Sequence, residues 1–337
     1  MGQSLIVSKI AVSKIAASKI SALLAAVTLA SAVPAIAQSW PTKPVRFVIP
    51  YAPGGIADIA ARIIGAKLTE SWGQQIVVEN KPGGNGSIGV STVAKAAPDG
   101  YTLLLATVGD FTLNPNLIKD LPYDVERDLV PITALTDTPC VVATHVASPY
   151  KTIADLLADA KARPGKIPVA TPGNGSINQL IMEWMGLGTG TKFQHIPYKG
   201  GAPAGAAVAA GDVPIGVLAV SSALPHLKSG RVRVLAVTTA KRSPFNPDWP
   251  TLQESGVPSV DGSNWTALMA PKGTAQAILD KVHADVLKVL AMPDVKERLA
   301  AGSATPIPTT PAELAAIFKR ETAAFKDIVQ KADIKAE

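Results

Sequence analysis

The chain from residue 45 onward alternates short apolar runs with longer amphipathic segments. Residues 45–49 form an apolar run that predicts a buried strand. The segment after it places Ile56, Ile63 and Leu68 on one face at the period of an α-helix. The next strand, helix and strand are predicted over residues 75–78, 88–97 and 101–106. Alternating strands and helices of this kind predict a parallel sheet that is covered by helices.

The same alternation returns in the second half of the chain. Helices and strands are predicted there over residues 153–162, 168–170, 177–187, 215–218 and 232–237. Two long amphipathic helices follow, one from Thr274 to about Met292 and one from Pro311 onward. The chain is therefore expected to be α/β with two units. A cleft between two such units, beyond the carboxyl ends of the strands, is a usual place for a ligand.

Two apolar runs, 139–145 and 265–269, look like crossovers between the two units. Two crossovers would leave both ends of the chain in the first unit. We therefore expect a discontinuous first domain of residues 38–139 and 264–337, and a second domain of residues 140–263.

The first 37 residues have a different character. They carry Lys9, Lys14 and Lys19 without any acid, then an apolar run over 20–30, then Ala35-Ile36-Ala37. A basic region, a short apolar region and an A-x-A site are typical of a secretory signal peptide, here cleaved after Ala37. The apolar run spans 11 residues, whereas a membrane-spanning helix needs about 20. We expect residues 1–37 to be removed and the protein to be periplasmic.

Charge and cysteine content narrow the classes of partner. The chain has 32 basic and 26 acidic side chains, and loss of the three leader lysines leaves 29 against 26. This mild excess suits anions, and no basic stripe with aromatics indicates a nucleic acid. Cys140 is the only cysteine and lies in an apolar run far from the cleavage site. We expect it to be buried, and the protein to carry no lipid anchor.

No pattern in the sequence points to catalysis. The four histidines are not spaced for a zinc-binding helix, and no C-x-x-C is present. Ser176, His195 and Asp212 could be written as a triad, but no G-x-S-x-G turn supports it. We therefore expect a protein that is not an enzyme, with no catalytic residue, metal or cofactor.

Three glycine-rich turns lie between a predicted strand and a predicted helix, over residues 50–55, 82–89 and 171–176. Glycine lets the backbone approach a ligand, and the free N–H groups of a helix start attract anions. The first and third turns occupy matching places in the two units. Facing each other across the cleft, they would form a two-sided anion-binding site. The alternative is that all three are ordinary strand–helix turns.

The second turn also matches a dinucleotide-binding pattern through Gly84, Gly86 and Gly89. This match supports an alternative function, a dinucleotide-binding oxidoreductase. Pro82 and Gly83 break the strand before the motif, however, and soluble nicotinamide cofactors belong to the cytoplasm. The structural reading of the turn is therefore favoured.

The loops together resemble a known family. Its motifs are similar to FVIPYAPGGIAD (47–58), VVENKPGGNGSIG (77–89), APDGYTLL (97–104), NP (114–115), LPYD (121–124), GNGS (173–176), HIPYKG (195–200), LAVT (235–238) and PTLQESG (250–256). In this order and over nearly all of the mature chain, they resemble the tripartite tricarboxylate transporter receptors, also called the Bug family. The resemblance implies a fold like that of type II periplasmic binding proteins, with two α/β domains joined by two crossover strands.

The resemblance also implies a function, which is capture of a small carboxylate in the cleft by domain closure, for a membrane permease. The ligand would be a dicarboxylate, an aromatic carboxylate or a similar acid, bound mostly by backbone N–H groups and hydroxyls. The implied ligand-binding residues are Tyr51, Ala52, Pro53, Gly54, Gly55, Asp58, Thr107, Val108, Asp110, Phe111, Thr171, Gly173, Asn174, Gly175, Ser176, Tyr198, Ala219, Val220, Ser221 and Ser222. A monomer is expected.

Two departures from the family pattern leave questions open. The family often has His where this chain has Gln179. Asp110 and Phe111 place an acid and an aromatic ring near the expected pocket. Phe111 could stack on an aromatic carboxylate and Asp110 could pair with an amine or a hydroxyl, or either residue could face away. A sensory receptor that signals to a membrane kinase would use the same pocket and remains an alternative.

Overall fold

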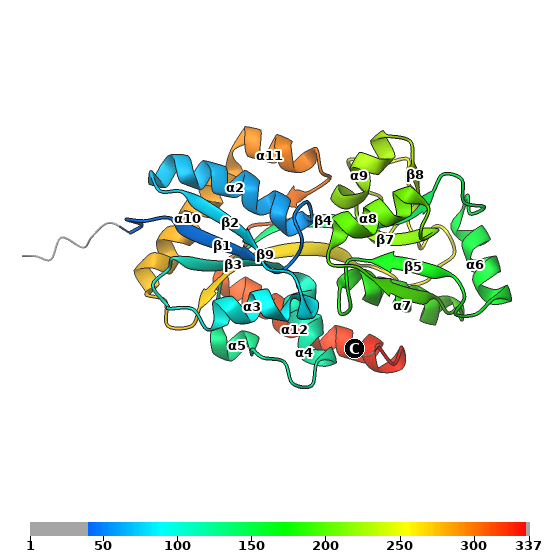
Figure 1. Cartoon of the computed structure of the whole chain (residues 1–337), viewed down its shortest axis with the longest axis horizontal. Helices are drawn as coiled ribbons and strands as arrows, with labels where there is room; N and C mark the ends of the chain where they lie inside the picture. The colour runs from blue at the N-terminus through cyan, green and yellow to red at the C-terminus, as the bar shows by residue number, and fades with distance from the viewer. Residues whose placement is uncertain (1–39, 335–337) are drawn as a thin grey trace, which may run out of the picture. The chain divides into compact units, whose positions relative to one another are not determined.

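The computed structural model describes residues 40–334, so the predicted signal peptide lies outside the described residues. Ten strands form the sheet: β1 (Val45–Ile49), β2 (Ile76–Asn80), β3 (Thr102–Thr107), β4 (Leu129–His145), β5 (Pro168–Thr171), β6 (Gln194–Pro197), β7 (Ile215–Ala219), β8 (Val232–Val237), β9 (Ser263–Pro271) and β10 (Thr305–Pro306). The order along the sheet is β2-β1-β3-β9-β4-β7-β5-β6, and β8 and β10 also pair with β4. Figure 1 shows β1, β2 and β3 on one side of β4 and β5 and β7 on the other.

The sheet is mixed: the strands of the predicted strand–helix–strand units are parallel, as expected, whereas the crossover strands are antiparallel. Pairs within β1–β3 and within β5–β7 are parallel, but every pair that involves β4 or β9 is antiparallel. The first part of β4, residues 129–139, pairs with β9, and its last part, residues 140–145, pairs with β7 and β8. β4 therefore takes the chain from the first group of strands into the second. After the second group the chain returns, and β9 pairs with β3 and β4 in the first group. Two strands that run in opposite directions pair as antiparallel neighbours.

Helices lie on both sides of each group of strands (Figure 1). The first group carries α2 (Ile56–Trp72), α3 (Ser87–Ala94), α4 (Asn114–Leu117), α5 (Val125–Asp128), α10 (Gln276–Ala291), α11 (Pro293–Ala300) and α12 (Pro311–Lys331), with short turns η1 (Gly84–Gly86) and η2 (Gly109–Leu113). The second carries α6 (Ile153–Ala162), α7 (Ile177–Thr189), α8 (Gly201–Ala210) and α9 (Val220–Lys228). The fold is thus two α/β domains joined by crossover strands. The exact domain boundaries expected from the sequence remain a prediction.

The apolar periodicity explains why the predicted helices form. In α2, Ile63, Ile64 and Leu68 are buried on the face toward the sheet, and each such side chain stabilises the fold by about 1.5–3 kcal/mol. The helix ends at Gly73, whose φ of 63° is the left-handed conformation that glycine tolerates. In the described part of the chain, no helix is long and apolar enough to cross a membrane.

Helix α8, like α9 of the same group, was not predicted. Its sequence, GAPAGAAVAA, is rich in Ala and Gly and shows no separate polar face. Small residues there allow a close helix contact, because a Cβ at Gly205 would lie 2.8 Å from the backbone oxygen of Ser222 in α9. Packing against α9 and the sheet, rather than an amphipathic pattern, therefore places α8.

Candidate functional site

Four helix N-termini converge on one small cavity between the two groups of strands. The cavity has a volume of about 20 Å³ and is lined by Tyr51, Gly55, Ile56, Ala57, Asp58, Thr107, Pro172, Ser176, Asn178, Gly201, Ala219, Ser222 and Asn264. These residues include the first turns or N-caps of α2, α7, α8 and α9. The first N–H groups of a helix have no partner within the helix, and the helix dipole adds partial positive charge there. The cavity is therefore suited to an anion.

The N-terminus of α2 is positioned by Asp58. This carboxylate accepts a hydrogen bond from the Gly54 N–H at 3.0 Å and two from Arg62, at 3.0 and 2.9 Å. Burial raises its pKa, but the bonds from Arg62 and Gly54 outweigh burial and lower it. No side chain caps this helix at Gly55. Asp58 thus fixes the loop while leaving the first N–H groups of α2 available.

The N-terminus of α7 is built differently, because its own side chains hydrogen-bond one of its first N–H groups and the loop before it. Ser176 Oγ accepts from the Gln179 N–H at 3.2 Å and donates to the Gly173 carbonyl at 2.7 Å. Gln179 Oε1 accepts from the Gly175 N–H at 2.7 Å. Gln179, the departure from the family pattern, therefore supports the loop from inside. Its side chain is buried and is not among the residues that line the cavity.

The third wall comes from α8 and α9. A Cβ at Gly201 would collide with Ser222 Oγ, so glycine at this position lets the two helix starts approach each other. Neither helix has a side-chain cap. The hydroxyl of Ser222 is buried and has no hydrogen-bond partner among the described residues. Asn264 Oδ1, from β9, is also buried and without a partner there.

A hydrogen-bonded network supports the other side of the cavity. Asp110 is fully buried and accepts from the Thr107 N–H at 2.9 Å, from Thr107 Oγ1 at 3.0 Å and from the Tyr51 hydroxyl at 3.2 Å. Burial raises the pKa of Asp110 to about 7, although these hydrogen bonds lower it. Burial and the nearby Asp110 also raise the pKa of Tyr51. The carboxylate is thus occupied by Tyr51 and Thr107, both of which line the cavity.

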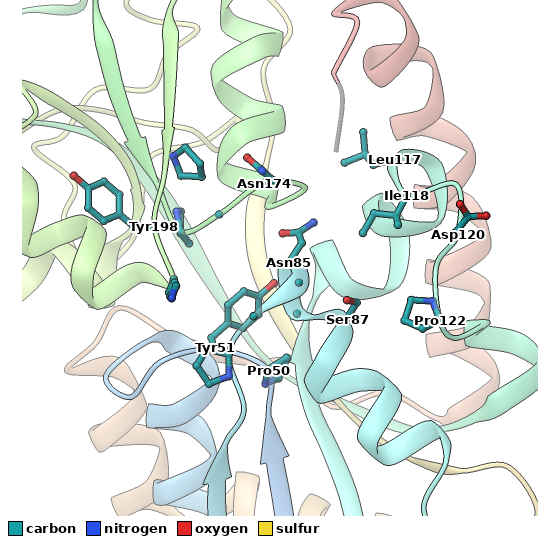
Figure 2. Close-up of a pocket in the computed structure, with 18 of the residues that line it drawn as sticks. Pro50, Tyr51, Asn85, Ser87, Leu117, Ile118, Asp120, Pro122, Asn174 and Tyr198 are labelled. Atoms are coloured by element: carbon teal, nitrogen blue, oxygen red, sulfur yellow. The ribbon is translucent and has the colours of Figure 1, made fainter. Parts of the chain in front are cut away.

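A larger hollow of about 690 Å³ lies on the outer side of Tyr51. Figure 2 shows Tyr51, Asn85 and Asn174 around it, with Leu117, Ile118 and Asp120 on the far side. The ring of Tyr198 points away from Asn85 and Asn174 in this view and packs against a core cluster of the second group. Tyr51 and Pro172 line both spaces. They therefore separate the inner cavity from the outer hollow.

The two groups of strands are in close contact around the cavity. A Cβ at Gly109 would lie 2.7 Å from the Gly175 oxygen, and a Cβ at Gly175 would collide with Asn85 Nδ2. A Cβ at Gly54 would lie 3.3 Å from the Cβ of Ala202. The structure therefore shows a closed cleft, in which glycines permit the contact.

The structure places the expected site residues in four groups. Those that line the inner cavity are Tyr51, Gly55, Asp58, Thr107, Ser176, Ala219 and Ser222. Those that line the outer hollow are Tyr51, Gly173, Asn174 and Tyr198. Those that line neither space are Ala52, Pro53, Gly54, Val108, Asp110, Phe111, Thr171, Gly175 and Val220. Ser221 lines a separate small void beside α2 and β4.

Phe111 belongs to the core. Its side chain is 1% exposed, and its ring centroid lies 5.0 Å from that of Phe318 and 6.1 Å from that of Trp265. The ring is thus not available to stack on an aromatic ligand, and facing away from the pocket is the arrangement observed. Aromatic packing of this kind is a sufficient reason for the residue.

Several lining residues were missed. The glycine-rich turn over residues 50–55 lies directly against the segment around Gly201. The Gly173–Ser176 loop was expected in that place. The adjacent Gly200-Gly201 pair was the available signal. Asn178, in α7, and Asn264, in β9, were missed because neither belongs to a glycine-rich turn.

The dinucleotide-like glycines are explained by packing. A Cβ at Gly89 would lie 2.7 Å from the Cα of Pro50, and a Cβ at Gly86 would collide with Asp110 Oδ1. Both glycines therefore let η1 and α3 approach β1 and the buried network. This is the structural reading favoured from the sequence.

Comparison with known proteins gives consistent matches. A family model described as "Tripartite tricarboxylate transporter family receptor" matches residues 60–334. A UPF0065 protein of Bordetella bronchiseptica is 36% identical over 310 residues, covering 92% of each chain. Protein BugT of Bordetella pertussis is 35% identical over 309 residues, covering 91% of this chain and 95% of BugT.

Solved structures are similar over most of the chain. A periplasmic transporter is 36% identical with a TM-score of 0.84, covering 88% of this chain and 99% of that one. R. palustris Rpa4515 with adipate is 32% identical with a TM-score of 0.85 and the same coverage. MatC from Rhodopseudomonas palustris with bound malate is 30% identical with a TM-score of 0.82, covering 86% of this chain and 100% of MatC. From the family model, the relatives and the fold together, the chain belongs to the receptor family of the tripartite tricarboxylate transporters.

Proposed function

We propose that this protein captures a small carboxylate by closure of its two domains and delivers it unchanged to a membrane permease. The observation that carries the proposal is the convergence of four helix N-termini on one buried cavity. No Lys or Arg lines this cavity in the described chain, and its one acid, Asp58, is paired with Arg62. A carboxylate there would be bound by backbone N–H groups and by the Ser222 hydroxyl.

The size of the two spaces suggests how a ligand lies. The inner cavity, at about 20 Å³, suits one end group, and the outer hollow, at about 690 Å³, begins on the other side of Tyr51. A ligand longer than its end group would reach past Tyr51. Two relatives were solved with adipate and malate, which are both dicarboxylates, and this chemistry supports an acid of the same class here.

The closing domains are proposed to be residues 38–139 with 264–337, and residues 140–263. The protein is proposed to act in the periplasm as a monomer after loss of residues 1–37. The ligand-binding set is proposed to comprise the lining residues of the inner cavity, with Ala52, Gly54, Gly173 and Gly175 shaping the loops around it. The bound state would be favoured because the closed form makes contacts to the ligand that the open form lacks.

Calorimetric titration of the purified protein with mono-, di- and tricarboxylates, aromatic acids and NADH tests this function. We expect saturable binding of one class of carboxylate in the titration. Thermal unfolding should show a rise in Tm that grows with the concentration of that acid, and the acid should be recovered unchanged after long incubation. NADH is the control and should leave Tm unmoved. Absence of binding by every carboxylate, or conversion of the acid, would contradict the proposal.

A further inference from the structure

We infer that the ligand carries a hydroxyl group beside its carboxylate, and that Asn264 Oδ1 accepts a hydrogen bond from this hydroxyl. The inference deepens the proposed function and rests on it, because it concerns the same cavity. It makes Asn264 a specificity-determining residue and narrows the ligand class to hydroxycarboxylates.

The orientation of Asn264 follows from its neighbours. Its Nδ2 donates to Asn178 Oδ1 at 3.4 Å, and Asn178 Nδ2 donates to Cys140 Sγ at 3.3 Å. This chain of donors occupies the amide nitrogen of each asparagine and leaves Asn264 Oδ1 without a donor. Asn264 is 5% exposed, lines the cavity and lies opposite Thr138 in the ladder between β4 and β9. An acceptor is therefore presented to a buried space.

A buried acceptor selects for a donor. An unsatisfied buried polar group costs about 1–3 kcal/mol, and a carboxylate oxygen beside Asn264 Oδ1 would place two acceptors against each other. The Ser222 hydroxyl and the uncapped starts of α2, α8 and α9 supply donors for the carboxylate. The cavity thus has donors on one wall and, in Asn264 Oδ1, an amide acceptor that has no donor among the described residues, which matches a carboxylate with a hydroxyl next to it.

The donor is assigned as a hydroxyl rather than an ammonium group because no free counter-charge lines the cavity. Asp58 is the one acidic residue among the lining residues, and Arg62 and the Gly54 N–H already occupy it. Asp110 lies behind Tyr51 and Thr107, which donate to it. A buried ammonium without a counter-charge is strongly disfavoured, whereas a hydroxyl carries no charge to compensate.

The test uses matched pairs of acids that differ by one hydroxyl: lactate and propionate, 3-hydroxybutyrate and butyrate, malate and succinate. Calorimetry on the wild-type protein should show that the hydroxy acid of the recognised length binds roughly tenfold or more tightly than its partner. Equal or tighter binding of the acid without the hydroxyl would overturn the inference and leave Asn264 Oδ1 to a water molecule. Failure of all carboxylates to bind would instead remove the proposed function itself.

Substitution then assigns the preference to Asn264. Asn264→Leu should bring the two affinities of the recognised pair to within about twofold. The matched control is Thr138→Val, because Thr138 is also buried with an unpartnered hydroxyl but lines a different void. It should keep the wild-type ratio. A preserved ratio in Asn264→Leu would overturn the assignment, and the wild-type pairs decide the ligand class even if this variant does not fold.

Discussion

The backbone N–H of Ala52 donates a hydrogen bond to the backbone carbonyl of Lys199, 3.2 Å away. Ala52 follows β1 and Lys199 follows β6, so this bond joins the two groups of strands directly. It uses no side chain, and its formation therefore depends on how closely the two loops approach. The contact between the two loops is thus a matter of backbone fit, and under the proposed closure, substitutions that change this fit should change ligand affinity.

Gly109→Ala should weaken ligand binding at least roughly tenfold, which is about 1.4 kcal/mol. The new Cβ would lie 2.7 Å from the Gly175 oxygen across the closed cleft, so the cleft would close less completely. Calorimetry measures the affinity, and small-angle scattering with ligand should show a more open average form. The control is Gly302→Ala, whose Cβ has contacts at 3.4 and 3.6 Å. Wild-type affinity in Gly109→Ala would refute the role of this contact.

Ser176→Ala should lower both stability and affinity. Loss of an N-cap costs about 1 kcal/mol of unfolding free energy, and loss of the bond to Gly173 loosens a loop beside the cavity. Affinity should fall by roughly 1–3 kcal/mol. Thr152→Ala removes the cap of α6, which contributes no residue to the cavity. In urea unfolding, Thr152→Ala should lose about as much stability as Ser176→Ala, while its ligand affinity stays at the wild-type value. A wild-type affinity for Ser176→Ala would show that the Gly173–Ser176 loop does not contribute to binding.

Asp110 should make stability depend on pH. Its pKa is raised to about 7 in the folded chain and is near 3.8 when unfolded. Between these values the folded chain binds more protons, so the free energy of unfolding should fall as pH rises from about 4 to about 7 and then level off. Asp110→Asn should reduce the difference in unfolding free energy between pH 5 and pH 8 by at least about 1 kcal/mol.

Urea unfolding at pH 5 and pH 8 measures that slope for each variant. Burial raises the pKa of Glu183 to about 7 as well, and it also raises the pKa values of Asp137 and Glu321, so the wild-type profile contains their contributions too. Comparing Asp110→Asn and Glu183→Gln with the wild type isolates the contributions of Asp110 and Glu183. An unchanged slope in Asp110→Asn would show that Asp110 does not titrate in this range.

Asp58→Ala should reduce ligand affinity roughly tenfold. It removes the acceptor of the Gly54 N–H and the partner of Arg62, so the start of α2 loses its support. Glu254→Ala is a suitable comparison, because Glu254 also pairs with an arginine, Arg242, and accepts a loop N–H, that of Thr251, away from the cavity. Calorimetry should show a loss of ligand affinity in Asp58→Ala and none in Glu254→Ala. Equal affinities would mean that α2 begins correctly without Asp58.

Much of the architecture could be predicted, because an element that buries one face repeats its apolar residues at the period of a helix or a strand. The strand over Val45–Ile49 and the helix over Ile153–Ala162 begin and end in the structure at the predicted residues. The directions of β4 and β9 could not be predicted, since an apolar run looks the same whichever neighbour it pairs with. α8 was missed for a related reason, because Ala and Gly give no stripe to recognise.

The candidate site was predicted where chemistry depends on local sequence. Gly55 and Ser176 lie at helix starts, and such positions are visible as turns before an apolar period. Asn264 and Gly201 reach the same cavity from elements distant in sequence, and that proximity is a property of the folded chain. Phe111 is the reverse case: it was expected near the pocket because it lies close to a loop motif in sequence, but its ring packs in the core against Trp265 and Phe318.

The crossover strand β4 has one further consequence. Its pairing with β9 extends to Pro139, and its pairing with β7 begins at Cys140, so no unpaired residue separates the two ladders. In the domain closure proposed above, movement of one domain against the other would have to twist this continuous strand, so β4 would act as an elastic hinge and its stiffness would limit how wide the cleft opens.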